Sequence, residues 1–449
     1  MTIRLPDEVN SALDRLEDAG FAAYAVGGCV RDLLMGRSPQ DYDITTAARP
    51  EQTAAVFASE RVIETGLRHG TVTVLLGGRP LEITTFRVDG PYSDARHPDA
   101  VRFTPSLRED LARRDFTMNA IACSPRRGLA DPFGGADDIR DRVIRCVGDP
   151  ETRFREDALR ILRCVRFSSA LGFSIDPPTA RAARENRALL GRVSAERAAA
   201  ELKKLVCGPF VRRVVLTETD ILGAVLPELL PMRGFDQRNK HHIYDVLEHC
   251  AAACEAVPPE PELRLAALLH DVGKPDCFFT DEDGVGHFYG HAERGAELTD
   301  ALLRRLRFAN DSRERVTELV RRHDMRIEPE KRAVLRCLRR FGPEFFFLLL
   351  KLKRADALAH APGPKTDERV ERCAALETLA RALMAEAACF SLRDLAVNGA
   401  DLLAAGYAPG PAVGQALETL LNAVTDGLVP NEKDSLLAYL AAAKSGEEP

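Results

Sequence analysis

Two aspartates spaced two residues apart follow a pair of adjacent glycines near the start of the chain. The run reads YAVGGCVRDLLMGRSPQDYDITT, with the glycines at Gly27 and Gly28 and the carboxylates at Asp41 and Asp43. In a β-strand, residues i and i+2 point to the same face, so both carboxylates would converge on one point. Two like charges held that close repel each other unless a divalent cation lies between them, and Mg²⁺ with oxygen ligands is the natural choice. The spacing therefore predicts a magnesium site.

A third carboxylate could complete this site. Glu82 lies in the strand-like segment LEITTFR. Such a cluster would hold one or two metal ions that activate a 3'-hydroxyl for attack on an α-phosphate and stabilise a pyrophosphate leaving group. The double glycine would let the backbone approach a phosphate chain at the start of a helix near Val30 to Asp32. The alternatives are a plain tight turn at the glycines and a solvated acidic turn after residues 38–40.

Two further segments combine basic and acidic side chains. Residues 113–119 read RRDFTMN, in which the arginines could grip a triphosphate while Asp115 and Asn119 reach ribose hydroxyls. A helix start with solvated charges is the alternative. Asp157 and Arg160 lie three apart in a helical segment, so they share a face and could read the Watson-Crick edge of a base. An ordinary helical ion pair explains the same spacing.

Histidines and aspartates at helix-compatible positions form a second constellation. His270 and Asp271 are adjacent at the end of an apolar helix, where one buried pair is commonly structural. The other candidates are His249, His291, His323 and Asp356, with His241-His242 competing for the place of His249. Mixed imidazole and carboxylate ligands suit Mn, Ni, Fe, Zn or Mg, and a metal bound there could generate a hydroxide that attacks phosphate esters.

The elements that must position these residues change in kind along the chain. To about residue 150 the pattern is mixed α/β, with strand-like segments at 22–26, 71–76 and 81–86 and a turn at 77–80. Beyond that point, apolar residues recur at three- and four-residue spacing, which predicts packed helices and no further strands. Helical segments are expected at 154–171, 196–207, 263–271, 312–323 and 344–360, with a polar break at 362–372 before a last helical segment.

Composition limits the class of protein. With 449 residues the chain is long enough for about three or four domains. The start lacks the layout of a secretion signal and no stretch is apolar enough to cross a membrane, so a cytoplasmic protein without a membrane partner is expected. The 11 scattered cysteines favour neither a disulfide framework nor a thiolate zinc site. A net charge of −6 argues against indiscriminate nucleic-acid coating but leaves room for a local RNA groove.

The ordered motifs resemble those of a known family across essentially the whole chain. The run GGCVRD followed by DYDI resembles the signature of the polymerase β nucleotidyltransferase superfamily, and specifically the class II CCA-adding tRNA nucleotidyltransferases and bacterial poly(A) polymerases. The likeness continues through HGTVTV, EITTFR, DGPYSDARHP, RRDFTMNAIA, the FGG turn at 133–135 and REDALRILRCVRFSSALGF. It implies an α+β fold, in which a polymerase β-like head with a mixed sheet precedes an all-α neck, body and tail.

The resemblance also implies an activity and its residues. The activity would be addition of CCA to the 3' end of tRNA from CTP and ATP, without a nucleic-acid template, with Mg²⁺ held by Asp41 and Asp43 and with Glu82 as a third catalytic residue. In relatives, the EDxxR element that matches Glu156, Asp157 and Arg160 selects CTP and ATP. The loop 89–98 resembles one that helps such enzymes switch from adding C to adding A. The implied nucleotide-binding residues are Gly27, Gly28, Arg31, Arg114, Asp115, Asn119, Glu156, Asp157, Arg160 and Arg163.

The histidine constellation has a resemblance of its own. The order H…HD…H…H…D is similar to that of HD-domain phosphohydrolases, which are fused to some bacterial CCA-adding enzymes and act there on cyclic phosphates. It implies a second divalent metal, of undetermined identity, held by His249, His270, Asp271, His291, His323 and Asp356. From Cys389 onward the chain resembles the region that grips the tRNA elbow in these enzymes, although a small packing module is an equally good interpretation of the residues.

These expectations define four regions and leave alternatives open. The head is expected at 1–150, the neck at 151–238, the HD domain at 239–365 and the tail at 366–449, with no obligatory protein partner. The rivals are a poly(A) polymerase, an enzyme that adds only CC or only A, and an HD phosphohydrolase with an RNA-binding head. The stretch TGLRHGTVTVLLGGRP lacks the basic GRR-containing version typical of poly(A) polymerases. The intact Asp-x-Asp and Glu-Asp-x-x-Arg elements argue against the phosphohydrolase-only interpretation.

Overall fold

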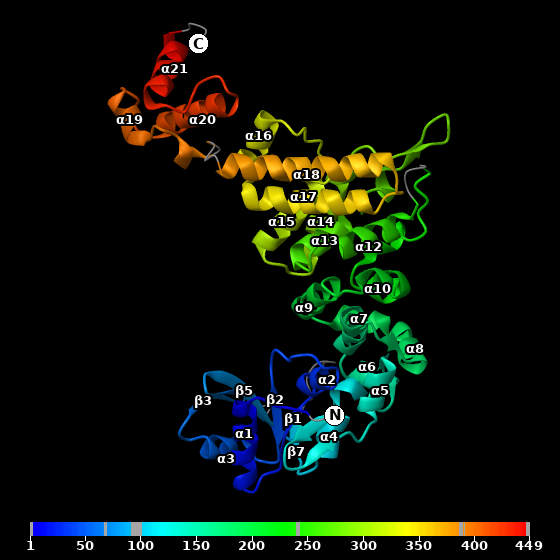
Figure 1. Cartoon of the computed structure of the whole chain (residues 1–449). Helices are drawn as coiled ribbons and strands as arrows, with labels where there is room; N and C mark the ends of the chain where they lie inside the picture. Colours follow the sequence, from blue (N-terminus) through cyan, green and yellow to red (C-terminus); the bar gives the residue numbers. More distant parts are fainter. Residues whose placement is uncertain are drawn as a thin grey trace. The chain divides into compact units, whose positions relative to one another are not determined.

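The chain folds into two compact units, each described here by itself. In the computed structural model, one unit comprises residues 1–230 with 305–308, and the other comprises residues 231–304 with 309–449 (Figure 1). The structure describes residues 3–66, 70–90, 101–238, 243–385, 389 and 391–445. The α+β class expected from the sequence is confirmed, because a seven-stranded sheet lies in the first unit and the second is mostly helical.

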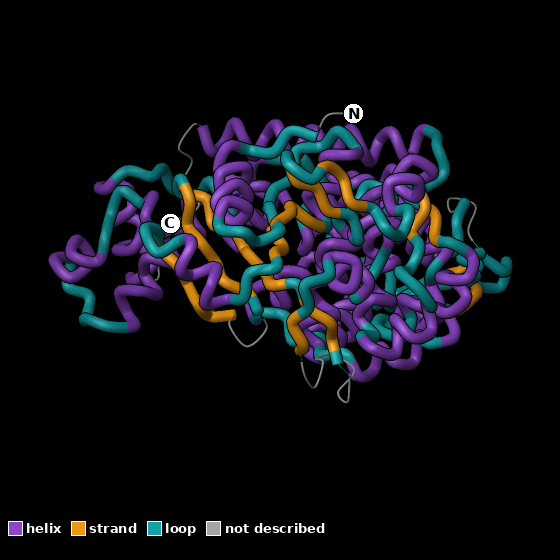
Figure 2. Tube along the Cα trace, turned by 90° about the horizontal axis from the view of Figure 1, so that it is seen from below, coloured by secondary structure: helices purple, strands orange, loops and turns teal. Residues whose placement is uncertain are grey.

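The sheet of the first unit has the strand order β3-β4-β5-β2-β1-β8-β9, and its strands lie alongside one another in Figure 2. Its strands are β1 Ala23–Val26, β2 Asp43–Thr46, β3 Arg61–Gly66, β4 Thr71–Leu76, β5 Arg79–Thr85, β8 Ala122–Ser124 and β9 Gly128–Ala130. Only β2 and β5 pair in parallel, and the other neighbours are antiparallel, so the sheet is mixed. The central strands β1, β2 and β5 therefore bring together segments that are distant in the sequence.

The turn before β5 is shorter than the sequence predicted. We expected a turn over residues 77–80, but Leu76 already pairs with Arg79, so the loop consists of Gly77 and Gly78 alone. Both glycines have positive φ, at 56° and 82°, which is the backbone that a two-residue hairpin loop requires. Pro80 is tolerated because it lies at the start of β5.

Helices complete the first unit. They are α1 Asp7–Asp18, α2 Gly28–Leu34, α3 Pro50–Val56, α4 Leu107–Ala112, α5 Gly135–Asp141, α6 Pro150–Glu156, α7 Leu159–Leu171, α8 Pro177–Glu185, α9 Ala195–Val206, α10 Val211–Thr217 and α11 Thr219–Leu222. Close packing of α5 explains the glycine turn at 133–135. A Cβ on Gly135 would lie 2.1 Å from the carbonyl oxygen of Thr117, so only glycine fits there.

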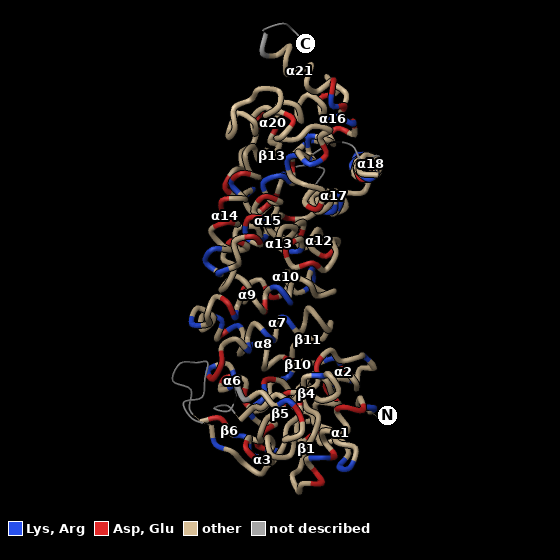
Figure 3. The backbone as a smooth tube through the Cα atoms, turned by 90° about the vertical axis from the view of Figure 1, so that its left-hand side faces the viewer, with Lys and Arg blue, Asp and Glu red and all other residues tan. Residues whose placement is uncertain are grey.

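Apart from one short hairpin, the second unit is built from helices. They are α12 Val246–Ala256, α13 Pro261–Leu269, α14 His291–Arg305, α15 Asn310–Arg322, α16 Lys331–Phe341, α17 Pro343–Leu358, α18 Pro364–Ala385, α19 Gly399–Ala404, α20 Pro411–Thr425 and α21 Lys433–Ser445. Apolar residues of the last three helices, including Leu402, Leu420 and Leu436, form a separate small core. Basic and acidic residues are interspersed along both units (Figure 3).

Two expectations about the helical part need correction. Strands do occur beyond residue 150, although each has two residues: β11 Ser174–Ile175 pairs with β10 Val143–Ile144, and β12 Phe279–Thr280 pairs with β13 Gly286–His287. The polar break expected at 362–372 is also shorter, because α18 begins at Pro364. Proline lacks the N–H that a first helical turn leaves unpaired, and Asp367 in that turn favours the helix dipole.

Candidate functional site

The head carboxylates meet where β2 and β5 run in parallel. Asp43 is the first residue of β2, and its Cα pairs in register with that of Glu82. Asp41 precedes it by two residues, and all three side chains are exposed. Partial desolvation of the Asp43 carboxyl raises its pKa. The charge of Arg114 lowers this pKa, whereas the charges of Glu82 and Asp41 raise it further. Carboxylates that repel one another in this way are a fitting set of oxygen ligands for a divalent cation.

A glycine turn lies against a half-buried arginine beside these carboxylates. Gly27 has a φ of 82°, and a Cβ there would lie 2.9 Å from Nη1 of Arg114. Burial lowers the pKa of Arg114, and Asp110 and Asp43 oppose that shift. The Nε of Arg114 is buried and has no hydrogen-bond partner among the residues that the structure describes. A half-buried guanidinium with one unsatisfied donor next to a glycine turn is well suited to a phosphate group.

Asp115 and Asn119 belong to a buried hydrogen-bond network rather than to a solvated helix start. Asp115 accepts from Arg163 on α7, with Nη2 to Oδ2 at 2.7 Å, and from Nδ2 of Asn119 at 3.0 Å. Asn119 in turn accepts from Arg31 of α2 at 2.8 Å. Burial would raise the pKa of Asp115, but Arg163 and the hydrogen bond from Asn119 lower it to about 2. The network therefore joins four of the expected nucleotide-binding residues.

We expected the Glu-Asp-x-x-Arg element to lie on one continuous helix, but the helix is interrupted there. Helix α6 ends at Glu156, and Asp157 is extended, with φ −140° and ψ 104°. The Asp157 carboxylate accepts from the backbone N–H of Leu159 at 3.1 Å, which caps the start of α7. A short acidic side chain that bonds to nearby backbone competes with helix continuation, and this explains the break.

Because of the break, Asp157 and Arg160 do not share a helix face, and each forms hydrogen bonds with other residues. Arg160 donates to Glu156 at 2.7 Å and to the backbone carbonyl of Arg113 at 2.9 Å. Asp157 accepts from Arg197 of α9 at 2.8 Å. Arg197 is thus a residue that the sequence analysis missed. Its neighbour Glu201 was missed as well, although it pairs with both Arg163 and Arg166. No local pattern reveals these contacts, because α9 is a separate segment.

The six histidines and aspartates expected in the second constellation come together in the second unit. Nε2 of His249 lies 3.2 Å from Nε2 of His270 and 3.0 Å from Oδ1 of Asp356. Nε2 of His291 lies 3.2 Å from Nε2 of His323, and Asp271 contacts His270, His291 and His323 at 3.3 to 3.5 Å. We call these six residues the histidine cluster.

Backbone carbonyls fix the orientation of all four rings. The Nδ1 atoms of His249, His270, His291 and His323 lie 3.2, 2.8, 2.8 and 2.6 Å from the carbonyl oxygens of Ala359, Ala267, Phe288 and Val320. If Nδ1–H donates to each carbonyl, the Nε2 lone pairs point into the cluster, which is the usual arrangement of metal-binding histidines. A donor set of four imidazoles and two carboxylates fits a divalent metal ion.

The buried aspartates of the cluster keep their charge. Burial would raise the pKa of Asp271, but Lys274 and His270 hold that pKa well below its usual range. Burial would also raise the pKa of Asp356, but its contacts with His249 and His270 hold that pKa well below its usual range. Lys274 Nζ lies 2.6 Å from Asp271, a contact that the sequence analysis missed.

His360 is a further neighbour that the sequence analysis missed. Its Nδ1 bonds to the carbonyl of Asp356, four residues earlier, and this helical spacing was the available signal. Its Nε2 accepts from Arg369 at 3.3 Å, and it groups with His249 and Asp356 at a spacing that could hold a metal ion. The competing pair His241-His242 and most of the loop 89–98 lie outside the described residues.

No helix among the described residues is long and apolar enough to span a membrane. The eleven cysteines all lie among the described residues and are thiols rather than disulfides. Three family models match parts of the chain. The poly(A) polymerase head domain matches residues 23–145, an RNA- and SrmB-binding site of polymerase A matches residues 172–232, and domain 2 of tRNA nucleotidyltransferases matches residues 291–440.

Curated proteins and solved structures resemble the chain over nearly its full length. A CCA-adding enzyme of Geobacillus stearothermophilus is 36% identical over 96% of each chain, and one of Streptococcus suis is 32% identical over 99% of each. The crystal structure of the Bacillus stearothermophilus CCA-adding enzyme in complex with CTP superposes with a TM-score of 0.73 at 34% identity, covering 98% of this chain and 97% of the other. The chain therefore belongs to the family of CCA-adding enzymes, as its ordered motifs predicted.

Proposed function

We propose that the protein adds CCA to the 3' end of tRNA, with CTP and ATP as donors and no nucleic-acid template. The observation that carries this proposal is the position of three exposed carboxylates beside Arg114 at the Gly27 turn, in a chain of the CCA-adding family. A CCA-adding enzyme of 34% identity was solved in complex with CTP, which supports CTP as a donor. The match of residues 172–232 to an RNA-binding segment supports a nucleic-acid partner.

The reaction forms one ester bond and breaks one anhydride bond. The 3'-hydroxyl oxygen of the tRNA bonds to the α-phosphorus, the bond from that phosphorus to the bridging oxygen breaks, and pyrophosphate leaves. The hydroxyl proton passes to solvent. Asp41, Asp43 and Glu82 would hold Mg²⁺, which supplies positive charge for the hydroxyl and the phosphates. Arg114 would orient the triphosphate, because its Nη1 lies against the Gly27 turn, its Nε is unsatisfied among the described residues, and its charge acts on Asp43.

Base selection is assigned to the segment between α6 and α7. Asp157 offers an acceptor and Arg160 offers donors, and each is held by a neighbour, Arg197 for the carboxylate and Glu156 for the guanidinium. A pocket with both a donor and an acceptor can discriminate cytosine and adenine from bases whose edges would leave buried groups unpaired. Asp115, Asn119, Arg163 and Arg31 form the connected network behind it.

The test supplies three tRNAs, which end before CCA, after C and after CC, each together with both CTP and ATP and with Mg²⁺. Sequencing of the 3' ends should show completion to CCA in every case. Asp41→Ala should abolish addition, whereas Asp137→Ala, which removes an exposed aspartate on α5, should leave it intact. Long A tails would indicate a poly(A) polymerase, and a stall after CC would indicate an enzyme that needs a second one to add A. Either result would overturn the proposal.

A second activity, metal-dependent phosphoester hydrolysis, is supported by the orientation of the four histidines. Water would add its hydroxyl to phosphorus while the ester P–O bond breaks and the leaving oxygen takes a proton. The histidine cluster would hold the divalent metal, which when bound supplies the positive charge that activates water. His270→Ala should abolish hydrolysis of bis(p-nitrophenyl) phosphate and leave CCA addition unchanged. Hydrolysis that survives His270→Ala would refute this assignment.

A further inference from the structure

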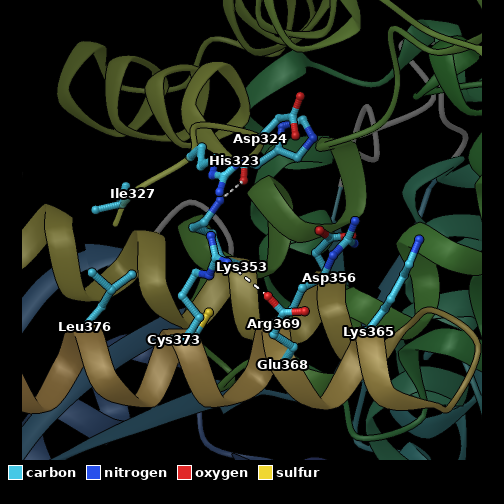
Figure 4. A pocket seen from close by; sticks show the side chains of 12 residues that line it. His323, Asp324, Ile327, Lys353, Asp356, Lys365, Glu368, Arg369, Cys373 and Leu376 are labelled. Carbon is cyan, nitrogen blue, oxygen red and sulfur yellow. Dashed lines mark hydrogen bonds and ion pairs between the residues drawn. The ribbon is translucent and has the colours of Figure 1, made fainter. Parts of the chain in front are cut away.

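Two cavities adjoin the histidine cluster from different sides. One, of about 490 Å³, is lined by Gly286 to His291 and by Lys274; we call it the ring cavity. The other, of about 430 Å³, is lined by α17 and α18 and is drawn in Figure 4; we call it the basic cavity. Both are lined by His323, Asp324, Asp356 and Arg369. A ligand bound at the cluster can therefore extend into either cavity.

His287 and Tyr289 line the ring cavity, and their rings lie against that of Phe279 on the β12–β13 hairpin. The ring centroids of Phe279, His287 and Tyr289 lie 5.3 to 5.6 Å from one another, so they form a triangular patch rather than a linear stack. Tyr289 is 76% exposed and Phe279 is 46% exposed. A hydrogen bond of 2.6 Å between His287 Nε2 and Asp281 fixes the His287 ring. Large exposed rings that are held in place suit base stacking, which is tolerant of sequence.

The basic cavity has a different character. Its cations are Arg326, Lys353, Lys365, Arg369 and Arg372, against the three carboxylates of Asp324, Asp356 and Glu368. Lys353 is fixed by the backbone carbonyls of His323 and Met325, at 2.7 and 2.9 Å, and Figure 4 shows it between the two walls of the cavity. An excess of cations around a cavity attracts anionic groups such as phosphates.

We propose that the ring cavity and the basic cavity together bind a single-stranded RNA end, with an unpaired base on the aromatic patch and backbone phosphates in the basic cavity. Nucleotide chains alternate planar bases with phosphates, which matches a ring surface on one side of the cluster and a cationic surface on the other. An acidic peptide would use the cations but would leave the aromatic patch unmatched. Such an RNA end would be the substrate class of the proposed hydrolytic site. Its turnover rests on the proposed phosphohydrolase activity, whereas its binding does not.

The test uses the full chain and an RNA hexamer that carries a 3'-phosphate and a terminal 4-thiouridine. Without a free 3'-hydroxyl this RNA cannot be extended by nucleotide addition. Ultraviolet cross-linking in the presence of chelator, followed by peptide mapping, should place the RNA on the hairpin at residues 279–291. Tyr289→Ala should reduce this cross-link by about tenfold, because stacking on one side chain contributes that much to affinity. Tyr289→Phe keeps the ring and should retain it.

A matched control lies on the same hairpin. Val285 is apolar and 37% exposed but lines neither cavity, so Val285→Ala should leave the cross-link unchanged. Arg372→Gln should weaken RNA binding and lower its salt dependence by about one phosphate contact. A wild-type protein whose cross-links fall only outside the hairpin, or an equal loss in Tyr289→Phe and Tyr289→Ala, would overturn the proposal.

Turnover distinguishes failure of this proposal from failure of the hydrolytic function. Suppose that the metal-loaded protein cleaves bis(p-nitrophenyl) phosphate, and that Tyr289→Ala lowers kcat/KM equally for this ester and for phosphate release from the hexamer. This result would refute the RNA site and support the phosphohydrolase. If no ester is cleaved but the hairpin cross-link appears and is lost in Tyr289→Ala, the RNA site stands and the phosphohydrolase falls. The expected result is a loss of kcat/KM confined to the RNA.

Discussion

Replacement of Asp115 by asparagine tests whether the buried network of the head is electrostatic in origin. In Asp115→Asn the shape of the side chain is kept, but the charge that pairs with Arg163 is lost. The pKa of Asp115 falls from 3.8 to about 2 on folding. Each pKa unit corresponds to about 1.4 kcal/mol, so the ionised carboxylate contributes about 2 kcal/mol to stability. Asp115 is 8% exposed, and screening by solvent is therefore small.

The sign of the pH dependence follows from the depressed pKa. The stability that Asp115 contributes is fully present above its unfolded pKa of 3.8 and is lost as the pH falls towards 2. The difference between wild type and Asp115→Asn should be about 2 kcal/mol above pH 5 and about half of that at pH 3. Hydrogen exchange of the amides of residues 115–124, corrected for intrinsic rates, measures the local opening free energy at each pH.

An exposed aspartate provides the control for this experiment. Asp137 pairs with Arg140 at 2.7 Å, but both side chains are more than two-thirds exposed. Asp137→Asn should therefore change the opening free energy by less than about 0.5 kcal/mol at either pH. A loss in Asp115→Asn that is no larger than in this control, or one that does not shrink in acid, would refute the electrostatic account of the network.

Three other substitutions probe neighbouring features. Gly27→Ala forces a side chain into a φ of 82° and against Arg114, so we expect nucleotide addition to fall by tenfold or more, about 1.4 kcal/mol, in a CTP incorporation assay. Arg197→Ala releases the carboxylate of Asp157 and should increase misincorporation of UTP and GTP while protein stability stays nearly constant; unchanged fidelity would contradict the role of α9. Lys274→Met removes the partner of a buried carboxylate and should lower the Tm of chelator-treated protein, with a cost of about 3 kcal/mol. If the Tm of that variant is unchanged, the carboxylate has another source of stabilisation.

Local spacing determined much of the candidate site. Extended backbone at an Asp-x-Asp pair predicts both side chains on one face, although β2 begins only at Asp43 and Asp41 lies before it. His270 and His323 follow α13 and α15, at the helix ends that apolar periodicity predicted. The ordered motifs were also sufficient to identify the family, because each is a short run whose residue types and order are legible without a structure. The same local rules predicted the change from a mixed α/β head to helices.

Tertiary structure alone decided which of these side chains meet. Glu82 reaches Asp43 only because β2 and β5 pair in parallel, and strand pairing depends on packing across the sheet rather than on either strand. The hydrogen bond from Arg197 to Asp157 joins α9 to a segment that is distant in the sequence. The Asp157 side chain also accepts from the backbone N–H of Leu159, which favours an extended backbone at Asp157 over a continuous helix. Backbone carbonyls from four different segments set the histidine rings. Such long-range contacts are fixed by the burial of the whole core, and a local pattern carries no information about them.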